Sequence, residues 1–314
     1  MKTTTTRIVP HWVSRSAFQI VIILFLFTEL ALALVLKSGA SLWFAVPLVM
    51  IVSHLMHGAA VGFHEASHGL LRRNRWFNEF DGILIGVFSF MSFSLYRAAH
   101  QAHHAHLATE RDEELWPFVQ PGTARWARIL AASLELTLGV FFTPFLFLRT
   151  FLRSGSPIRS KKVRRRIWAE LVLMVAVLCV VIAAVSHFAL WRYFVWMYAV
   201  PTFIAGNLQS WRKYIEHVGM MGTTINSSTR SIVANDWVGR LVSFTLLHEP
   251  YHGVHHIHLG VPHAELPGLA SSLNPTEPEE RHPFSNYRAA LKDMLRSLRN
   301  PRVGAQWRNE EVQS

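Results

Sequence analysis

The stretch AFQIVIILFLFTELALALVL (residues 17–36) decides the class of fold. All but three of its residues are apolar, and an α-helix needs roughly 20 such residues to cross the hydrocarbon core of a bilayer. A signal peptide would have a shorter apolar region of about 7–15 residues, so we expect a transmembrane helix that is retained. Similar stretches at residues 42–62, 171–190 and 193–211 bring the predicted number of crossings to four.

The composition supports a membrane protein. Charged residues make up 16% of the chain, against about 25% in a typical soluble domain, and hydrophobic residues make up 51%. The formal net charge is +11, but the basic residues cluster beside apolar segments and no nucleic-acid-binding motif accompanies them. We therefore attribute the charge to membrane topology and anionic lipid, and expect no nucleic acid partner. The one cysteine, Cys179, lies in an apolar run and excludes an internal disulfide.

The order of segments predicts an all-α, multi-pass membrane protein with about four spans, interfacial helices and a cytoplasmic histidine-rich cap. We expect a single membrane-embedded domain over residues 1–314, with an N-terminal tail at 1–16 and a polar tail at 274–314. Residues 82–95 are apolar but too few for an ordinary span, which suits an interfacial or re-entrant segment. Basic residues crowd 149–166 and mark that segment as cytoplasmic, so we interpret 129–152 as a hairpin or a surface-lying element.

Three short histidine motifs carry the candidate chemistry. The first is His64-Glu-Ala-Ser-His68, and the second and third share the spacing HxxHH. Positions i, i+3 and i+4 of a helix lie on one face, so each motif presents its imidazoles together. The three motifs supply eight imidazoles, more than one ion can hold, and they predict two nitrogen-bound transition metals. Their histidines are His64 and His68, then His100, His103 and His104, then His252, His255 and His256.

Two further features adjoin these motifs. His217 lies just beyond the last predicted span and could supply a ninth imidazole. The acidic run at residues 109–114 follows the second motif, and its carboxylates could orient histidines by accepting the second ring N–H. For most of that run we expect a solvated surface. His258 does not share the helical face of His252 and His256, so we expect a structural role for it.

The histidines form a set that consists of HxxxH at 64–68, HxxHH at 100–104, a lone His217 and HxxHH at 252–256. This set resembles that of the membrane fatty acid desaturase and hydroxylase family. Leu266-Pro267 after the third motif is similar as well. The resemblance implies a non-haem di-iron centre at the cytoplasmic face, with dioxygen as co-substrate, and an enzyme that desaturates or hydroxylates an unactivated C–H position of a lipid, in the first place a fatty acyl chain. It implies these metal ligands: His64, His68, His100, His103, His104, His217, His252, His255 and His256.

The chain departs from that family in two respects. Some members have an Asn four residues before the lone histidine that binds through water, and this chain has Lys213 there. A haem-binding His-Pro-Gly-Gly stretch is absent from the sequence, so we expect a separate electron donor, a ferredoxin or a small cytochrome with its reductase. A basic cytoplasmic surface would suit an acidic donor.

Other functions fit parts of the pattern. A carotenoid or a smaller amphiphile could replace the acyl chain within the same family. The motif His64-Glu65-x-x-His68 is also typical of zinc metalloproteases, in which the glutamate is the general base, and Asp81 is then a candidate third ligand. An intramembrane protease leaves both HxxHH motifs unexplained. A metal transporter would need ligands along the spans, where the sequence has only His54, His57 and His187.

Overall fold

The computed structural model describes residue 13 and residues 15–308, so most of the predicted N-terminal tail and the last six residues lie outside the described part. The described residues form helices and no strand, apart from one isolated bridge between Ile232 and Phe284, which confirms the all-α class. The elements are α2 (Ala17–Lys37), η1 (Leu42–Phe44), α3 (Ala45–Ser67), α4 (Arg75–Phe88), α5 (Phe93–Ala105), α6 (Arg125–Leu152), α7 (Lys161–His187), α8 (Trp191–Tyr193), the π-helical η2 (Phe194–Ala199), α9 (Val200–His217), α10 (Ile225–Ser228), α11 (Trp237–Thr245), α12 (His252–Ile257), η3 (His263–Leu273), α13 (Tyr287–Ser297) and η4 (Ala305–Trp307).

The chain divides into two compact units. Unit 1 comprises the described residues within Met1–Ala17, His100–Leu134 and Trp211–Ser314, and unit 2 comprises Phe18–Ala99 and Glu135–Ser210. Helices α5, α6 and α9 each contribute residues to both units. The single domain over residues 1–314 remains a prediction.

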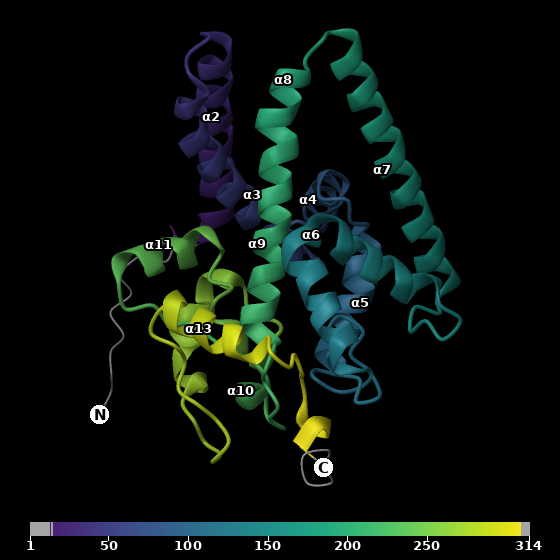
Figure 1. Cartoon of the computed structure of the whole chain (residues 1–314), viewed down its shortest axis with the longest axis vertical. Coiled ribbons are helices and arrows are strands. Elements are labelled where there is room, and N and C mark those ends of the chain that lie inside the picture. The colour runs from purple at the N-terminus through teal and green to yellow at the C-terminus, as the bar shows by residue number, and fades with distance from the viewer. Residues whose placement is uncertain (1–12, 14, 309–314) are drawn as a thin grey trace. The chain divides into compact units, whose positions relative to one another are not determined.

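Four helices are long and apolar enough to cross a membrane, as expected in number. Three of them, α2, α3 with η1, and α7, include or largely overlap predicted spans. The fourth is α6, which we had interpreted as a hairpin or surface-lying element, whereas the predicted span at 193–211 is not one of the four. That segment belongs instead to a continuous helical stretch from α8 through η2 to α9, and Figure 1 shows this stretch starting after the turn at the end of α7 and diverging from α7.

Helix α6 is interrupted by a kink. Leu138 has non-helical backbone angles (φ −126°, ψ 29°), and the N–H of the next residue, Gly139, donates to the side chain of Asn207 on α9 at 2.7 Å. A Cβ at Gly139 would lie 2.1 Å from Ser210 Oγ, so only glycine allows this close approach. A polar residue of α9, Asn207, thus satisfies the broken backbone of α6.

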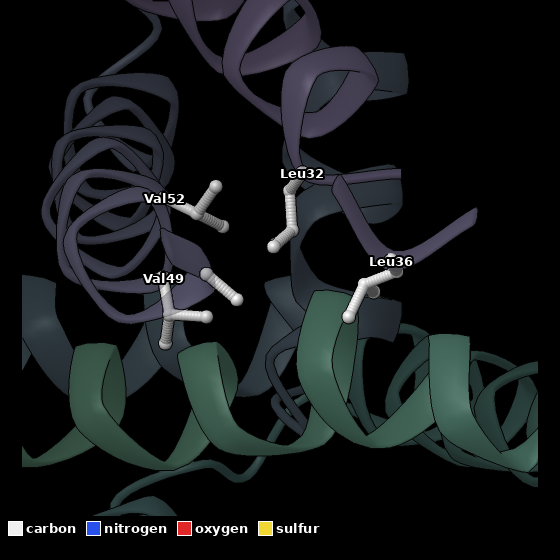
Figure 2. Packing of buried hydrophobic residues seen from close by; sticks show 5 residues of the cluster. Leu32, Leu36, Val49 and Val52 are labelled. Atoms are coloured by element: carbon white, nitrogen blue, oxygen red, sulfur yellow. The ribbon is translucent and has the colours of Figure 1, made fainter. Parts of the chain in front are cut away.

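Apolar packing joins α2 to α3 in unit 2. Leu32 and Leu36 of α2 contact Val49 and Val52 of α3, and Figure 2 shows these side chains converging between the two helices. Partly buried residues of η2 and α9 cover the same cluster. Because lipid is as apolar as these side chains, close packing rather than escape from water stabilises the contact.

The N-terminus of α5 is held by a buried carboxylate of α7. Glu170 accepts hydrogen bonds from the Ser92 hydroxyl (2.7 Å), the Ser94 N–H (2.8 Å) and the Ser94 hydroxyl (2.6 Å). A negative charge is favourable at this end of a helix, where backbone N–H groups lack partners. Helices α4 and α5 are bent by 102° at the break before Ser92 and Ser94, within the segment predicted to be interfacial or re-entrant. Glu170 therefore sets the direction of the helix that carries the second histidine motif.

The described part of the C-terminal tail belongs to unit 1 and packs within it. Helix α13 buries Ala290 and Met294, and Trp307 is 1% exposed. Arg128 of α6 lies over the Trp307 ring at 4.2 Å and donates to the Pro301 carbonyl at 2.9 Å. Residues 274–314 are thus polar in overall composition, but they contain an amphipathic segment that buries apolar side chains.

Candidate metal centre

The second histidine motif lies on the last turns of α5, and two carboxylates from the following loop hold its rings. Asp112 Oδ2 accepts from His103 Nδ1 at 2.8 Å, and Glu114 Oε2 accepts from His100 Nδ1 at 2.9 Å. Asp112 is fully buried and also accepts the backbone N–H groups of Ala108 and Leu115. Two members of the acidic run thus orient histidines, as the sequence suggested was possible.

The third motif forms α12, a short helix buried on nearly every side. Glu249, three residues before it, accepts from His252 Nδ1 at 3.1 Å, and Glu216 at the end of α9 lies 3.7 Å from the same nitrogen. Arg212 joins the two carboxylates, with its Nη1 2.7 Å from Glu216 and 2.8 Å from Glu249. The backbone N–H of Gly253 donates to Ser231 Oγ at 2.8 Å, and a Cβ there would lie 2.8 Å from Leu273, so the helix is tightly enclosed.

Within unit 1, seven of the nine predicted ligands converge through their other ring nitrogen. The Nε2 atoms of His104 and His100 are 2.9 Å apart, and those of His255 and His104 are 3.2 Å apart. In a second series, the Nε2 atom of His252 lies 2.9 Å from that of His217 and 3.0 Å from that of His256. Nitrogens bound at right angles about 2.1 Å from one ion lie about 3.0 Å apart, so these separations match a metal-ligand shell.

The seven imidazoles form two neighbouring groups. One ligand atom from each of His100, His104 and His255 lies within 4.8 Å of the others, and the same holds for His103, His217 and His256. His252 lies beside the second group, with Glu216 and His217. The ring centroids of His104 and His256 are 4.3 Å apart, so the groups adjoin. Each group could hold one metal ion.

The donor set fits a transition metal. His100, His103 and His252 each place Nδ1 against a carboxylate, which directs Nε2 at the other rings. Metal-bound histidines typically donate the second ring N–H to a carboxylate in this way, because the hydrogen bond fixes the tautomer and raises ligand basicity. An all-imidazole site of this kind suits iron, zinc, copper or nickel.

In the second group the electrostatics favour neutral rings for His217 and His256, whereas for His103 the effect of burial is outweighed by Asp112 and Glu114, which raise its pKa to about 9. Burial lowers the pKa of His217 and His256 well below the usual value, and the neighbouring histidines lower it further. Neutral imidazole is the form that binds a metal, so these rings need lose no proton on binding. Burial also raises the pKa of the Glu216 carboxyl to about 8, with Arg212 opposing and Glu249 adding to the effect.

His64 and His68 belong to unit 2 and lie at the C-terminal end of α3. Their rings meet edge to face with centroids 5.0 Å apart, as the i, i+4 spacing predicts. Asn78 of α4 donates to the Ala66 carbonyl at 2.8 Å and holds this end of the helix. Asp81, the candidate third ligand of a zinc protease, is instead paired with Arg72 at 2.5 Å. The roles of His64 and His68 as ligands stay predictions.

Three residues around His252 were missed from the sequence: Arg212, Glu216 and Glu249. The spacing that revealed the histidines could have revealed them too, because Arg212 and Glu216 are four apart on α9 and Glu249 precedes His252 by three. His258 stays outside both groups of imidazoles, at the C-terminal cap of α12.

Fold and site together define a helical membrane protein with a buried histidine cluster that could hold metal. A family comparison makes the class more specific: the fatty acid desaturase family matches residues 41–288, which is more than half of the chain and includes all nine predicted ligands. The chain therefore belongs to the fatty acid desaturase family, and this family implies an oxidoreductase that desaturates or hydroxylates lipid. No curated protein matches the chain.

Proposed function

We propose that the protein is a dioxygen-dependent oxidoreductase that desaturates or hydroxylates a lipid-borne acyl chain at a histidine-ligated pair of iron ions. The observation that carries this proposal is the pair of adjoining imidazole groups, His100, His104 and His255 beside His103, His217 and His256. Both groups lie in a chain of the fatty acid desaturase family. His64, His68 and His252 complete the proposed set of nine ligands.

The bound metals would supply the redox chemistry, which is the activation of dioxygen for attack on a strong C–H bond. The protein residues orient the ligands and set their protonation. Asp112, Glu114 and Glu249 hold three rings in the Nδ1–H tautomer, so that Nε2 remains available as a ligand. Burial keeps the pKa of His217 and His256 low, so these two rings remain available to metal near neutral pH.

The proposed substrate follows from the membrane setting. Four apolar helices suit an enzyme whose substrate is itself part of the bilayer, and a fatty acyl chain fits the family. A carotenoid or a smaller amphiphile would fit the same setting and remains the alternative substrate class. We expect the electrons to come from a separate protein, a ferredoxin or small cytochrome with its reductase.

We propose that the histidine motifs face the cytoplasm. Arg72, Arg73 and Arg75 follow the first motif directly, and a dense run of basic residues covers 149–166. Short loops rich in Lys and Arg stay on the cytoplasmic side, so this distribution supports one orientation.

Metal analysis and lipid analysis test the proposal together. The intact protein should purify with about two irons per chain, and cells that express it should contain lipid that has lost two hydrogens or gained one oxygen atom. His103→Ala should abolish both signals, whereas His258→Ala, a histidine beside the third motif but outside the groups, should retain them. One zinc without iron, and loss of function in Glu65→Gln alone, would instead identify a zinc hydrolase.

A further inference from the structure

Helix α11 in unit 1 has an unusual distribution of side chains. Three of its four exposed residues are apolar, with Trp237 75%, Val238 48% and Leu241 52% exposed. Its buried positions are small or polar, namely Gly239, Ser243 and Thr245. A helix on the surface of a water-soluble domain buries its apolar stripe and exposes polar residues, so α11 is reversed relative to that pattern.

The exposed face of α11 matches the lipid-facing positions of the candidate spans. Phe27 on α2 is 67% exposed and Val180 on α7 is 68% exposed, and both lie on helices long and apolar enough to cross a membrane. Because side chains of this size are costly to leave in water, the same medium should cover α11. A bilayer is the apolar medium that this chain already requires.

The length and chemistry of α11 select the interface rather than the interior of the bilayer. Nine residues of α-helix span about 14 Å, too little to cross the hydrocarbon core. Trp237 begins the helix, and tryptophan is enriched at the level of the lipid headgroups. Arg240 is exposed between Val238 and Leu241, where its long side chain can reach headgroup phosphates while its stem stays in apolar surroundings.

We propose that α11 is an interfacial helix whose Trp237, Val238 and Leu241 face is embedded at the bilayer surface. The inference concerns a lipid contact of unit 1 and does not depend on which metal or substrate the protein uses. Failure of one proposal therefore leaves the other standing.

This lipid contact is rigidly linked to the third histidine motif. The turn after α11 is closed by the hydrogen bonds from His248 N–H to the Ser243 carbonyl (2.7 Å) and from Tyr251 N–H to the His248 carbonyl (3.0 Å). Leu247 is fully buried, and Leu247 and His248 both have left-handed backbone angles (φ 50° and 57°). Since His252 follows directly, the depth of α11 in the bilayer fixes the level of α12 relative to the lipid headgroups.

Spin labels on the full-length protein in lipid nanodiscs test the proposal. Cys179 lies exposed on the apolar α7, so a nitroxide on the native cysteine provides the lipid-facing reference. In a Cys179→Ser background, labels at Leu241→Cys and at Lys292→Cys, an exposed polar position on α13, are then compared. Each label is relaxed in turn by oxygen, which concentrates in lipid, and by a water-soluble nickel chelate.

We expect the label at Leu241→Cys to resemble Cys179, with frequent collisions with oxygen and few with the chelate, and Lys292→Cys to show the reverse. If Leu241→Cys collides with the chelate as often as Lys292→Cys does, the helix faces water and the proposal fails. Protection from both reagents would mean that a protein surface covers α11, which also overturns it. Circular dichroism and size-exclusion chromatography of each variant establish that the labelled proteins are folded.

Discussion

In unit 2, α2 and α3 meet through Leu32, Leu36, Val49 and Val52, whereas in unit 1 the segments that carry histidines meet through ion pairs and hydrogen bonds. The first kind of contact depends on shape alone, and losing a methyl group weakens it by a small amount. In the second kind, each group buries a charge or a polar atom that needs its partner, so one deletion leaves another group unsatisfied. We therefore expect substitutions in unit 1 to be far more damaging than matched ones in unit 2.

The largest effect should follow from His256→Ala. The His256 ring lies 4.3 Å from that of His104 and 4.5 Å from that of His252, so it contacts members of both imidazole groups. We expect bound iron to fall to a small fraction of the wild-type amount and activity to fall to background. Elemental analysis of the purified protein measures the first, with His258→Ala as the control. Wild-type iron content in His256→Ala would remove this residue from the ligand set.

Arg212→Leu should be the next most severe change. The Arg212 side chain is 12% exposed and pairs with Glu216 and Glu249, so its removal leaves the oxygens of two buried acidic groups without this partner and should cost about 3–5 kcal/mol. Arg212→Lys keeps the charge and should recover part of the loss. Arg308→Leu removes an ion pair of a more exposed arginine with Glu279 and should cost less than about 1 kcal/mol. Denaturant unfolding in detergent compares the three, and equal losses for Arg212→Leu and Arg308→Leu would contradict the buried network.

Acid should destabilise unit 1 through His248 and His263. Burial lowers the pKa of His248 to about 3 and that of His263 to about 4, so the folded state holds both rings neutral. The unfolded chain takes up protons below about pH 6.5, so stability is full above that pH and should fall by roughly 2 kcal/mol for each ring by pH 5.

The unfolding temperature measured from pH 7 to pH 5 tests this linkage. In the double variant His248→Gln, His263→Gln the unfolding temperature should fall less steeply with pH than in the wild type. Loss of metal in acid is common to both proteins, so it does not account for a difference between them. Identical slopes would show that these two rings do not carry the effect.

A moderate loss of metal affinity is expected for Asp112→Asn. The amide keeps the size of the side chain but removes the charge that holds His103 Nδ1–H, and changes of this kind reduce metal affinity by about 10–100-fold. Competition with a metal chelator measures the affinity. Glu110→Gln, in the exposed part of the same acidic run, should leave it unchanged. An Asp112→Asn protein with wild-type affinity would mean that the carboxylate only stabilises the loop.

The smallest loss of stability is expected for substitutions at the apolar contact in unit 2. Val52→Ala removes two methyl groups from a fully buried position against α2 and should cost about 1 kcal/mol. Val180→Ala on the exposed face of α7 should cost less, because lipid fills the space. The difference is measured as the fraction folded in a titration with denaturing detergent. A Val52→Ala loss as large as that of Arg212→Leu would overturn the contrast between the units.

Much of the fold could be predicted from local patterns, but not the choice of spans. Hydropathy located α2, α3 and α7 because each is apolar over its own length. It does not decide the fourth span between α6 and the stretch at 193–211, and it does not register the pairing of the two, in which Asn207 of α9 accepts the N–H at the kink of α6. Two polar residues of α9, Asn207 and Ser210, are thus partners of α6.

The sequence by itself determined that the chain is helical, that it is built for a membrane, and that its histidines come in motifs with faces suited to metal. These properties depend on residues within four positions of one another, where helix geometry alone sets the spacing. Only the tertiary structure decided that the imidazoles of unit 1 form two adjoining groups, and that Asp112, Glu114, Glu216 and Glu249 are the carboxylates that hold or approach their rings. Those pairings join residues from 3 to 151 positions apart, and which of many similar side chains meet depends on how the helices pack.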